Sequence, residues 1–169
     1  MPSTYEPIAT QTLGTAAASV TFSSISGSYT DLVLIISGQS TSGGNSDGLA
    51  IRVNSDTGAN YSATLLRGDG TSAISSRNSS DTFYRIAFYG QTGSAVLSSF
   101  STTILNFQNY SNATTYKTLL ARANVAADGT AAVVGLWRNT AAITSITLVG
   151  YSGNLATGST FSLYGIKSA

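Results

Sequence analysis

The chain has 169 residues, a net charge of +1 and only 9% charged residues. That length is enough for one domain with a substantial core, and the lack of a basic run argues against nucleic-acid binding through phosphate contacts. Cysteine and histidine are both absent, which excludes disulfides, zinc sites of the common kinds, cysteine nucleophiles and a histidine general base. We therefore expect no cofactor and no metal.

Serine and threonine provide most of the polar side chains. The chain contains 27 serines and 23 threonines, which stand in for the missing charges. Neutral polar groups lose their hydration at a smaller free-energy cost than ions. Such a surface suits a protein that packs against neighbours, although a neutral surface without a partner fits the same composition. No apolar stretch approaches the roughly 20 residues of a membrane span, so we expect no membrane partner.

Short runs rich in β-branched and aromatic residues recur along the chain, and few windows have a helical apolar period. The first long run, Thr30–Gly38, is almost continuously apolar, as in a strand covered on both faces. In the next run Leu49, Ile51 and Val53 alternate with other residues and share one face. About ten strands are predicted in chain order: 18–22, 30–38, 48–53, 60–67, 82–90, 100–107, 116–125, 131–137, 143–151 and 159–166.

This pattern predicts an all-β fold, a two-sheet antiparallel β-sandwich of jelly-roll type. Residues 1–14 are predicted to be an N-terminal arm and first strand region, and residues 15–169 a single β-sandwich domain. The arm holds both prolines of the chain, Pro2 and Pro7, where a missing backbone donor does not interrupt a sheet. The serine-rich stretches 39–48 and 70–81 are predicted to be exposed loops that could contact partners.

The stretch "RVNSDTGANYSA" (52–63) has polar side chains at two-residue spacing around a glycine. Asn54, Asp56 and Asn60 faintly resemble the start of a calcium loop, but the position that requires a bidentate Glu holds Leu65. In a tight turn, Asn54 and Asp56 would bind nearby backbone amides and Gly58 would take a positive φ. We favour the turn and leave an ion at Asn54 and Asp56 open.

The acidic residues form no recognisable catalytic pair. Glu6 is the only glutamate, and Asp31 and Asp81 are the least turn-like of the six aspartates. A glycosidase needs two carboxylates across a cleft, and a serine nucleophile would need Lys117 or Lys167 as its base. Neither arrangement is indicated by spacing, so we expect no catalytic residues and no enzyme activity. An enzyme that acts on envelope sugars remains a third hypothesis.

Aromatic side chains suggest a second kind of site, because exposed rings can stack on glycans. Most of them are equally well explained by core packing and strand pairing. Trp137 lies among apolar residues and is predicted to be in the core, whereas its neighbour Arg138 could stack or cap. The aromatic residues considered are Tyr84, Phe88, Tyr89, Tyr110, Tyr116, Trp137 and Tyr151.

Four stretches, in their order along the chain, carry a resemblance to known proteins: "YEPIATQTLGTAAASVTFSSISGSYTDLVLIISG", "RVNSDTGANYS", "VVGLWRNTAAITSITLVG" and "GSTFSLYGIK". With these the chain resembles a diffuse group of small β-rich structural proteins of tailed bacteriophages. The resemblance implies a sandwich without enzyme activity or a metal site, working as part of a homo-oligomer. Proteins of this group are head decoration (cement) proteins or domains of tail fibres and tips.

Tail fibres usually contain shaft repeats, whereas this chain is predicted to be a compact sandwich without them. This favours a location on the phage head over one in the tail. The resemblance therefore leads us to expect a capsid cement protein on the outer surface of the head, as a homotrimer that bridges major capsid protein subunits. The arm would contribute partner contacts through Pro2, Tyr5 and Pro7. The alternative is a tail-fibre or tail-tip module that binds host-surface polysaccharide through aromatic and hydroxyl-rich loops.

Overall fold

The computed structural model describes residues 4–43, 46–86, 92–94, 100–126 and 128–167. This part of the chain forms strands and no helix, so it has no helix that could span a membrane. The strands are β1 (Tyr5–Thr12), β2 (Ser19–Phe22), β3 (Asp31–Ser40), β4 (Ser46–Asp47), β5 (Leu49–Val53), β6 (Tyr61–Gly68), β7 (Ala73–Asp81), β8 (Tyr84–Arg85), β9 (Thr92–Ser94), β10 (Ser101–Gln108), β11 (Lys117–Val125), β12 (Gly129–Trp137), β13 (Ile146–Gly150) and β14 (Thr160–Ile166).

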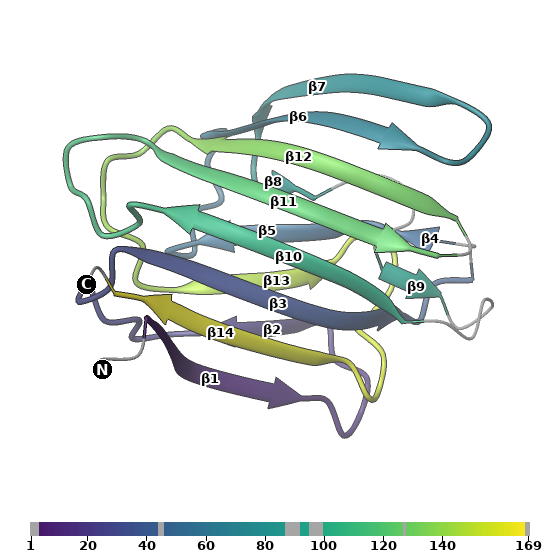
Figure 1. Cartoon of the computed structure of the whole chain (residues 1–169), viewed down its shortest axis with the longest axis horizontal. Coiled ribbons are helices and arrows are strands. Elements are labelled where there is room, and N and C mark those ends of the chain that lie inside the picture. Colours follow the sequence, from purple (N-terminus) through teal and green to yellow (C-terminus); the bar gives the residue numbers. More distant parts are fainter. Residues whose placement is uncertain (1–3, 44–45, 87–91, 95–99, 127, 168–169) are drawn as a thin grey trace.

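Two sheets form the two layers of a sandwich, which confirms the predicted fold class. The main path of the large sheet is β1-β14-β3-β10-β11-β12-β6-β7, and the four-stranded small sheet has the order β2-β13-β5-β8. Figure 1 shows the large sheet in front, with the small sheet behind its middle strands. The strand pairs are antiparallel except for the short contact between β3 and β9. We call the large-sheet surface that points away from the small sheet the outer face.

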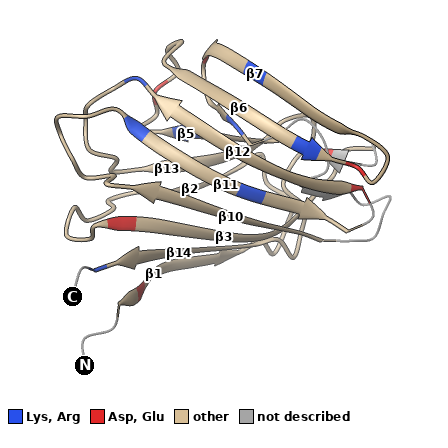
Figure 2. Ribbon diagram, turned by 45° about the horizontal axis from the view of Figure 1, so that its top comes forward, with Lys and Arg blue, Asp and Glu red and all other residues tan. Residues whose placement is uncertain are grey.

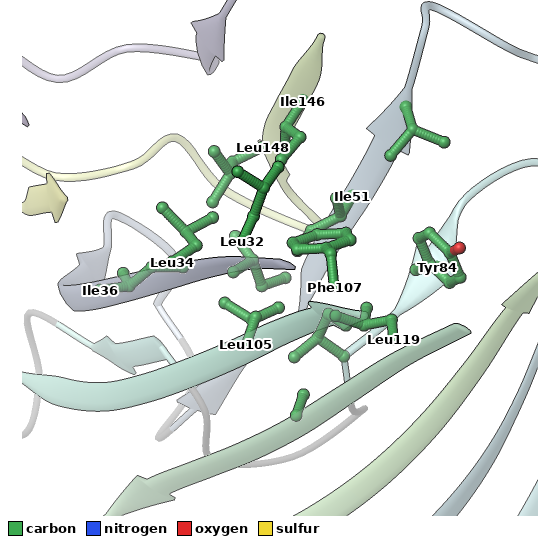
Figure 3. Close-up of a cluster of buried hydrophobic side chains, with 14 of the residues drawn as sticks. Leu32, Leu34, Ile36, Ile51, Tyr84, Leu105, Phe107, Leu119, Ile146 and Leu148 are labelled. Atoms are coloured by element: carbon green, nitrogen blue, oxygen red, sulfur yellow. The ribbon is translucent and has the colours of Figure 1, made fainter. Parts of the chain in front are cut away.

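The core lies between the two layers. Alternate residues of β3, β10 and β11 point toward the small sheet, among them the fully buried Leu34, Phe107 and Leu119. Ile51 and Leu148 of the small sheet meet them from the other side (Figure 3). The predicted alternation in β5 is confirmed, because Leu49, Ile51 and Val53 are all buried. Each of these side chains contributes roughly 1.5–3 kcal/mol through burial.

One glycine allows the largest aromatic group of the core to pack. The rings of Tyr61, Tyr84 and Phe107 form edge-to-face pairs, and Tyr61 is stacked near Trp137. A Cβ atom at Gly135 on β12 would lie 2.5 Å from Cδ1 of Tyr84. The missing side chain therefore lets the Tyr84 ring lie directly on the large sheet.

Residues 1–14, predicted to be an N-terminal arm and first strand region, contain a strand of the large sheet. Residues 5–12 form β1, an edge strand of the large sheet that pairs with β14 from Tyr5↔Ile166 to Thr12↔Thr160. Its register shifts between Pro7 and Ala9. An edge strand tolerates proline because one side of its backbone makes no ladder bonds, and bulges are common at sheet edges. The first strand region predicted within residues 1–14 is therefore present as β1, and residues 1–3 lie outside the described part.

The two serine-rich stretches predicted to be loops also contain strands. Most of 70–81 is β7, the other edge of the large sheet, and its side chains are exposed or half-buried throughout. Because neither face of β7 lies in the core, its sequence has no apolar alternation. In the stretch 39–48, β3 continues to Ser40 and β4 follows, while residues 44–45 lie outside the described part.

Two other predicted strands also differ. Within 82–90 the structure describes a strand only at Tyr84–Arg85, and residues 87–90 are outside the described part. The strand predicted over 143–151 begins at Ile146. The expectation that 30–38 is covered on both faces is correct only for its first half, since Ile35 is 38% exposed on the outer face.

Candidate functional site

The Arg52–Ala63 stretch folds as a tight connection between β5 and β6, held by the Asp56 carboxylate. One oxygen of Asp56 accepts a hydrogen bond from the backbone amide of Gly58 at 2.7 Å. The other accepts one from the Asn60 side chain at 2.9 Å and one from the Trp137 indole nitrogen at 2.6 Å. Burial alone would raise the pKa of Asp56, but these three hydrogen bonds together lower it.

Asn54 fixes the same connection from the other side. Its side-chain oxygen accepts hydrogen bonds from the backbone amides of Thr144 and Ser145, and its side-chain nitrogen donates to the carbonyl of Ala142. Asn54 and Ser55 both have a positive φ, at 51° and 56°. The side chains of Asn54 and Asp56 thus bind backbone groups, as expected for a turn.

Gly58 was predicted to have a positive φ, and this prediction was wrong. Positive φ occurs at Asn54 and Ser55, and Gly58 is not among the described glycines with a positive φ. A Cβ atom at Gly58 would lie 2.8 Å from the Asn60 side-chain nitrogen and 3.1 Å from an Asp56 oxygen. The missing side chain of Gly58 therefore leaves room for the hydrogen-bonded ends of Asn60 and Asp56.

This geometry leaves the turn poorly suited to calcium. Both Asp56 oxygens already accept hydrogen bonds from N–H donors, whereas a calcium site needs six or more oxygen ligands directed at one point. Among the described residues no cluster of three or more Asp, Glu, His or Cys could hold a metal. We interpret Asn54 and Asp56 as structural residues.

The carboxylate of Asp47, which is buried, also has a structural role. It accepts hydrogen bonds from the Ser40 hydroxyl at 2.6 Å and from its own neighbour Gly48 at 2.7 Å. The backbone amides of Ser152 and Gly153 donate to it as well, at 3.0 Å each. Asp47 thereby joins β3 and β4 to the loop that follows β13.

The two aspartates considered for catalysis lie on different parts of the large sheet. Asp31 is on β3 and Asp81 is on β7, five strand spacings apart, which is about 24 Å along the sheet. Carboxylates that act on one glycosidic bond are about 5–10 Å apart. Asp81 is also engaged with Arg85 at 3.3 Å. These two residues cannot form the catalytic pair of a glycosidase.

The lysines considered as bases are engaged in other contacts. Lys117 is buried, and its amine donates to the backbone carbonyls of Thr115 at 2.6 Å and Thr140 at 3.0 Å. Burial lowers the pKa of Lys117. Lys167 forms an ion pair with Glu6 at 2.8 Å. No described contact joins either amine to a serine hydroxyl.

The aromatic residues divide into buried and exposed groups. Tyr84, Tyr110 and Trp137 are buried, which confirms the prediction for Trp137, while Tyr116 and Tyr151 are exposed. Arg138 caps the turn beside it, donating from its guanidinium to a backbone carbonyl at 2.8 Å. Phe88 and Tyr89 lie outside the described residues.

One exposed aromatic cluster stands at the β8 edge of the small sheet. The Arg85 guanidinium lies 5.3 Å from the ring centres of both Phe83 and Tyr151, and Arg52 lies 5.9 Å from the Phe83 ring. Arg85 also donates to the Tyr151 hydroxyl at 3.1 Å. The Tyr151 side chain is 45% exposed.

The outer face of the large sheet is the most extensive candidate surface. Residues that pair directly across neighbouring strands form rows on it. We call one of these the central row: Pro7, Tyr164, Val33, Asn106, Leu120, Val134, Thr64 and Arg77. The adjacent row on the same face contains Ile35, Ile104, Arg122, Ala132, Leu66 and Ser75.

The middle of the outer face is apolar although no part of the described chain covers it. Leu66 is 58% exposed, Leu120 44% and Val134 43%. These side chains line a groove of about 660 Å³, together with Arg122. The sequence signal for this face is a set of apolar doublets, 65–66, 119–120 and 133–134, since neighbours in a strand point to opposite faces. Sequence reasoning did not use this signal.

Charges are sparse on the outer face and mainly positive. Figure 2 shows that the strands of the large sheet are largely uncharged. By strand register, the charged residues of the outer face are Arg77 on β7, Arg122 on β11 and Asp31 on β3. Arg77 and Arg122 make no ion pair within the described part of the chain. Asp31, at the end of β3, accepts a hydrogen bond from the backbone amide of Asn109 at 2.7 Å.

The residues predicted to bind a partner are partly on this face. Pro7 belongs to the central row, and Tyr5 pairs with Ile166 in the row that also contains Asp31. Tyr5 is 55% exposed. Pro2 lies outside the described residues. The sheet therefore brings Tyr5 and Pro7 onto the same face as the apolar groove, and their binding role remains a prediction.

No protein-family model and no curated protein matches the chain. Among solved structures, it is similar to a toad ovary galectin in complex with thio-digalactose, at 13% identity and a TM-score of 0.40, over 86% of this chain and 99% of the galectin chain. A protein of unknown function from Shewanella oneidensis MR-1 has 9% identity and a TM-score of 0.26, over 98% of this chain and 71% of that one. Both likenesses are too distant to carry an argument.

Proposed function

We propose that the chain is a non-enzymatic structural protein of a tailed bacteriophage virion, and that it acts as a capsid decoration (cement) protein. The observation that carries this proposal is the uncovered apolar middle of the outer face, with Leu66, Leu120 and Val134 exposed together. Contiguous exposed apolar surface marks sites of contact with other molecules. The resemblance of four stretches of the sequence to phage structural proteins supports the same class.

The mechanism is multivalent burial of surface across the junctions between major capsid protein subunits. A homotrimer would present three outer faces at once, so that weak single contacts combine into strong attachment. The low charge of the chain, 9% of residues, reduces the free-energy cost of removing water from such contacts. Attachment on the outside of the head would hold neighbouring subunits together against the pressure of the packaged genome.

Immunogold labelling of intact virions with an antibody to this protein tests the location. Gold on heads is expected. In the accompanying binding test, the recombinant chain should bind heads assembled without it. Gold on tails would contradict the decoration role, and particles without gold would remove the virion hypothesis altogether.

A second candidate is a tail module that binds host-surface polysaccharide. It is favoured by the cluster of Phe83, Arg85 and Tyr151, where a 45% exposed tyrosine ring lies beside a guanidinium. Such a ring can stack on a sugar while the guanidinium binds its hydroxyl groups. Soluble host glycans should then raise the melting temperature of the wild-type protein but not of Tyr151→Ala. No shift with any glycan would exclude this candidate.

A further inference from the structure

We propose that the outer face binds a protein surface on which carboxylate groups stand among apolar side chains, and that Arg122 is the centre of that contact. This inference rests on the proposed function and specifies the chemistry of the partner surface. It follows from three features of the outer face: the shape of its groove, the charges that line it, and the width of its apolar part.

The groove has the size and lining of a specific contact site. Its volume is about 660 Å³, and the side chains that line it are mostly apolar or small, from strands β10, β11, β12, β6 and β7. Binding sites of this kind combine an apolar floor with a few polar groups that fix orientation. Here Leu66, Leu120 and Val134 form the floor and Arg122 is the charged group.

Arg122 stands where an ion pair would be shielded from water once a partner is bound. Its neighbours across the strands are Ile104 and Ala132, and Leu120 is two residues away on the same face. The groove lining described here includes Arg122 and no acidic residue. A guanidinium binds a carboxylate through two parallel hydrogen bonds, which makes arginine effective at interface ion pairs.

The same charges argue against a second copy of this chain as the occupant. Face-to-face packing of two copies would bring Arg77 and Arg122 of both into one contact, and like charges opposed in an interface are strongly unfavourable. The acidic residue of this face, Asp31, lies at the end of β3 and is already bound by a backbone amide. A partner that supplies carboxylates is favoured instead.

The width of the apolar part favours a protein surface over a small ligand. Exposed apolar residues extend from Ile35 on β3 to Leu66 on β6, four strand spacings or about 19 Å. The full face from β1 to β7 spans seven spacings, about 34 Å. A nucleic acid would instead need cations along the face and no apolar centre.

The test measures binding of the full chain to heads assembled without it, by co-sedimentation at several salt concentrations. Arg122→Glu should weaken binding at least about tenfold, because it places a negative charge against the partner's carboxylates. Arg122→Lys should weaken it less, because the charge remains and the two-point geometry is lost. Leu120→Ser should weaken it independently of salt, whereas wild-type binding should weaken as salt rises.

Arg138→Glu is the matched control, since it makes the same charge change on the turn after β12 and should leave binding within about twofold of wild type. Analytical ultracentrifugation of every variant reports the oligomeric state. Loss of binding with an unchanged sedimentation coefficient and melting temperature supports the proposal. Loss that coincides with a change in oligomer mass would assign the face to a second copy and overturn it.

Two results separate this inference from the proposed function. If the wild type binds heads and Arg122→Glu binds as tightly, the inference fails while the decoration role stands. If the wild type does not bind heads at any salt concentration, both fail together.

Discussion

Leu119 and Leu120 are neighbours on β11, yet Leu119 is fully buried against the small sheet and Leu120 is 44% exposed on the outer face. The strand is the same and the side chains are identical, so the difference lies only in what stands opposite each face. The small sheet covers the inner residue. The outer residue has no such cover within the described chain, although its chemistry is that of a core position.

This comparison shows that the large sheet presents two apolar surfaces, of which folding uses one. The inner surface determines stability, because its burial accompanies formation of the sandwich. The outer surface contributes little to the stability of the single chain and is available for association. Substitutions on the two faces should therefore separate stability from binding.

The largest expected effect is on the inner face, at Phe107. Phe107→Ala removes a fully buried ring that contacts Tyr84 and should lower the free energy of unfolding by about 3–5 kcal/mol. Urea denaturation followed by the fluorescence of Trp137 measures it. A loss below about 1 kcal/mol would show that this part of the sandwich is not the main core.

The next largest effect on stability is expected at Asp56, whose carboxylate accepts hydrogen bonds beside the core. Asp56→Ala leaves the indole N–H of Trp137 and the backbone amide of Gly58 without their acceptor, and should lower the free energy of unfolding by about 2–3 kcal/mol. Addition of calcium should leave the wild-type melting temperature unchanged. A rise with calcium would contradict the structural interpretation of this turn.

The Asp56 contribution should depend on pH with a defined sign. The folded-state pKa of Asp56 lies below the ordinary aspartate value of 3.8, so the unfolded chain binds more protons as the pH falls. The stability gained from the carboxylate is therefore present above about pH 4 and is lost as the pH falls through the folded pKa. The stability difference between wild type and Asp56→Asn should be constant from about pH 5 to 7 and should shrink below pH 4.

A smaller effect is expected where the large sheet approaches Tyr84. Gly135→Ala places a methyl group 2.5 Å from the Tyr84 ring and should lower the free energy of unfolding by about 1–2 kcal/mol. Gly14→Ala is the matched control, because nothing lies within 4 Å of its Cβ position. Equal melting temperatures for the two variants would show that the Tyr84 ring can move aside without loss.

Much of the fold could be predicted from the sequence, because buried strands carry their own pattern. In β5 the alternation of Leu49, Ile51 and Val53 identified the strand and its buried face correctly. The edge strand β7 was predicted to be a loop, and this was wrong for a physical reason. Residues of β7 face no core on either side, so no selection for burial marks them, and Pro7 is tolerated in β1 only because that strand is an edge.

The candidate site was harder to predict than the fold. The turn around Asp56 was recognised as structural, but its partner Trp137 is 81 residues away in the sequence and no local pattern connects them. The outer face requires the register of neighbouring strands before Leu120 and Val134 can be placed side by side. A doublet of apolar residues shows that both faces of a strand are apolar, but not which face is left uncovered.

The smallest effect on stability is expected from substitutions on the outer face. This measurement distinguishes most clearly between the inner and the outer face of the large sheet. Leu120→Ser and Val134→Thr, together in one chain, should change the free energy of unfolding by no more than about 0.5 kcal/mol, because both side chains are already largely exposed in the single chain. The free energy of unfolding of this double variant is measured by the same urea titration that is used for Phe107→Ala. A loss of more than about 2 kcal/mol, dependent on protein concentration, would mean that the outer face is already covered in an oligomer of the isolated protein. Unchanged stability with an unchanged oligomeric state is the result expected of a surface kept apolar for another protein.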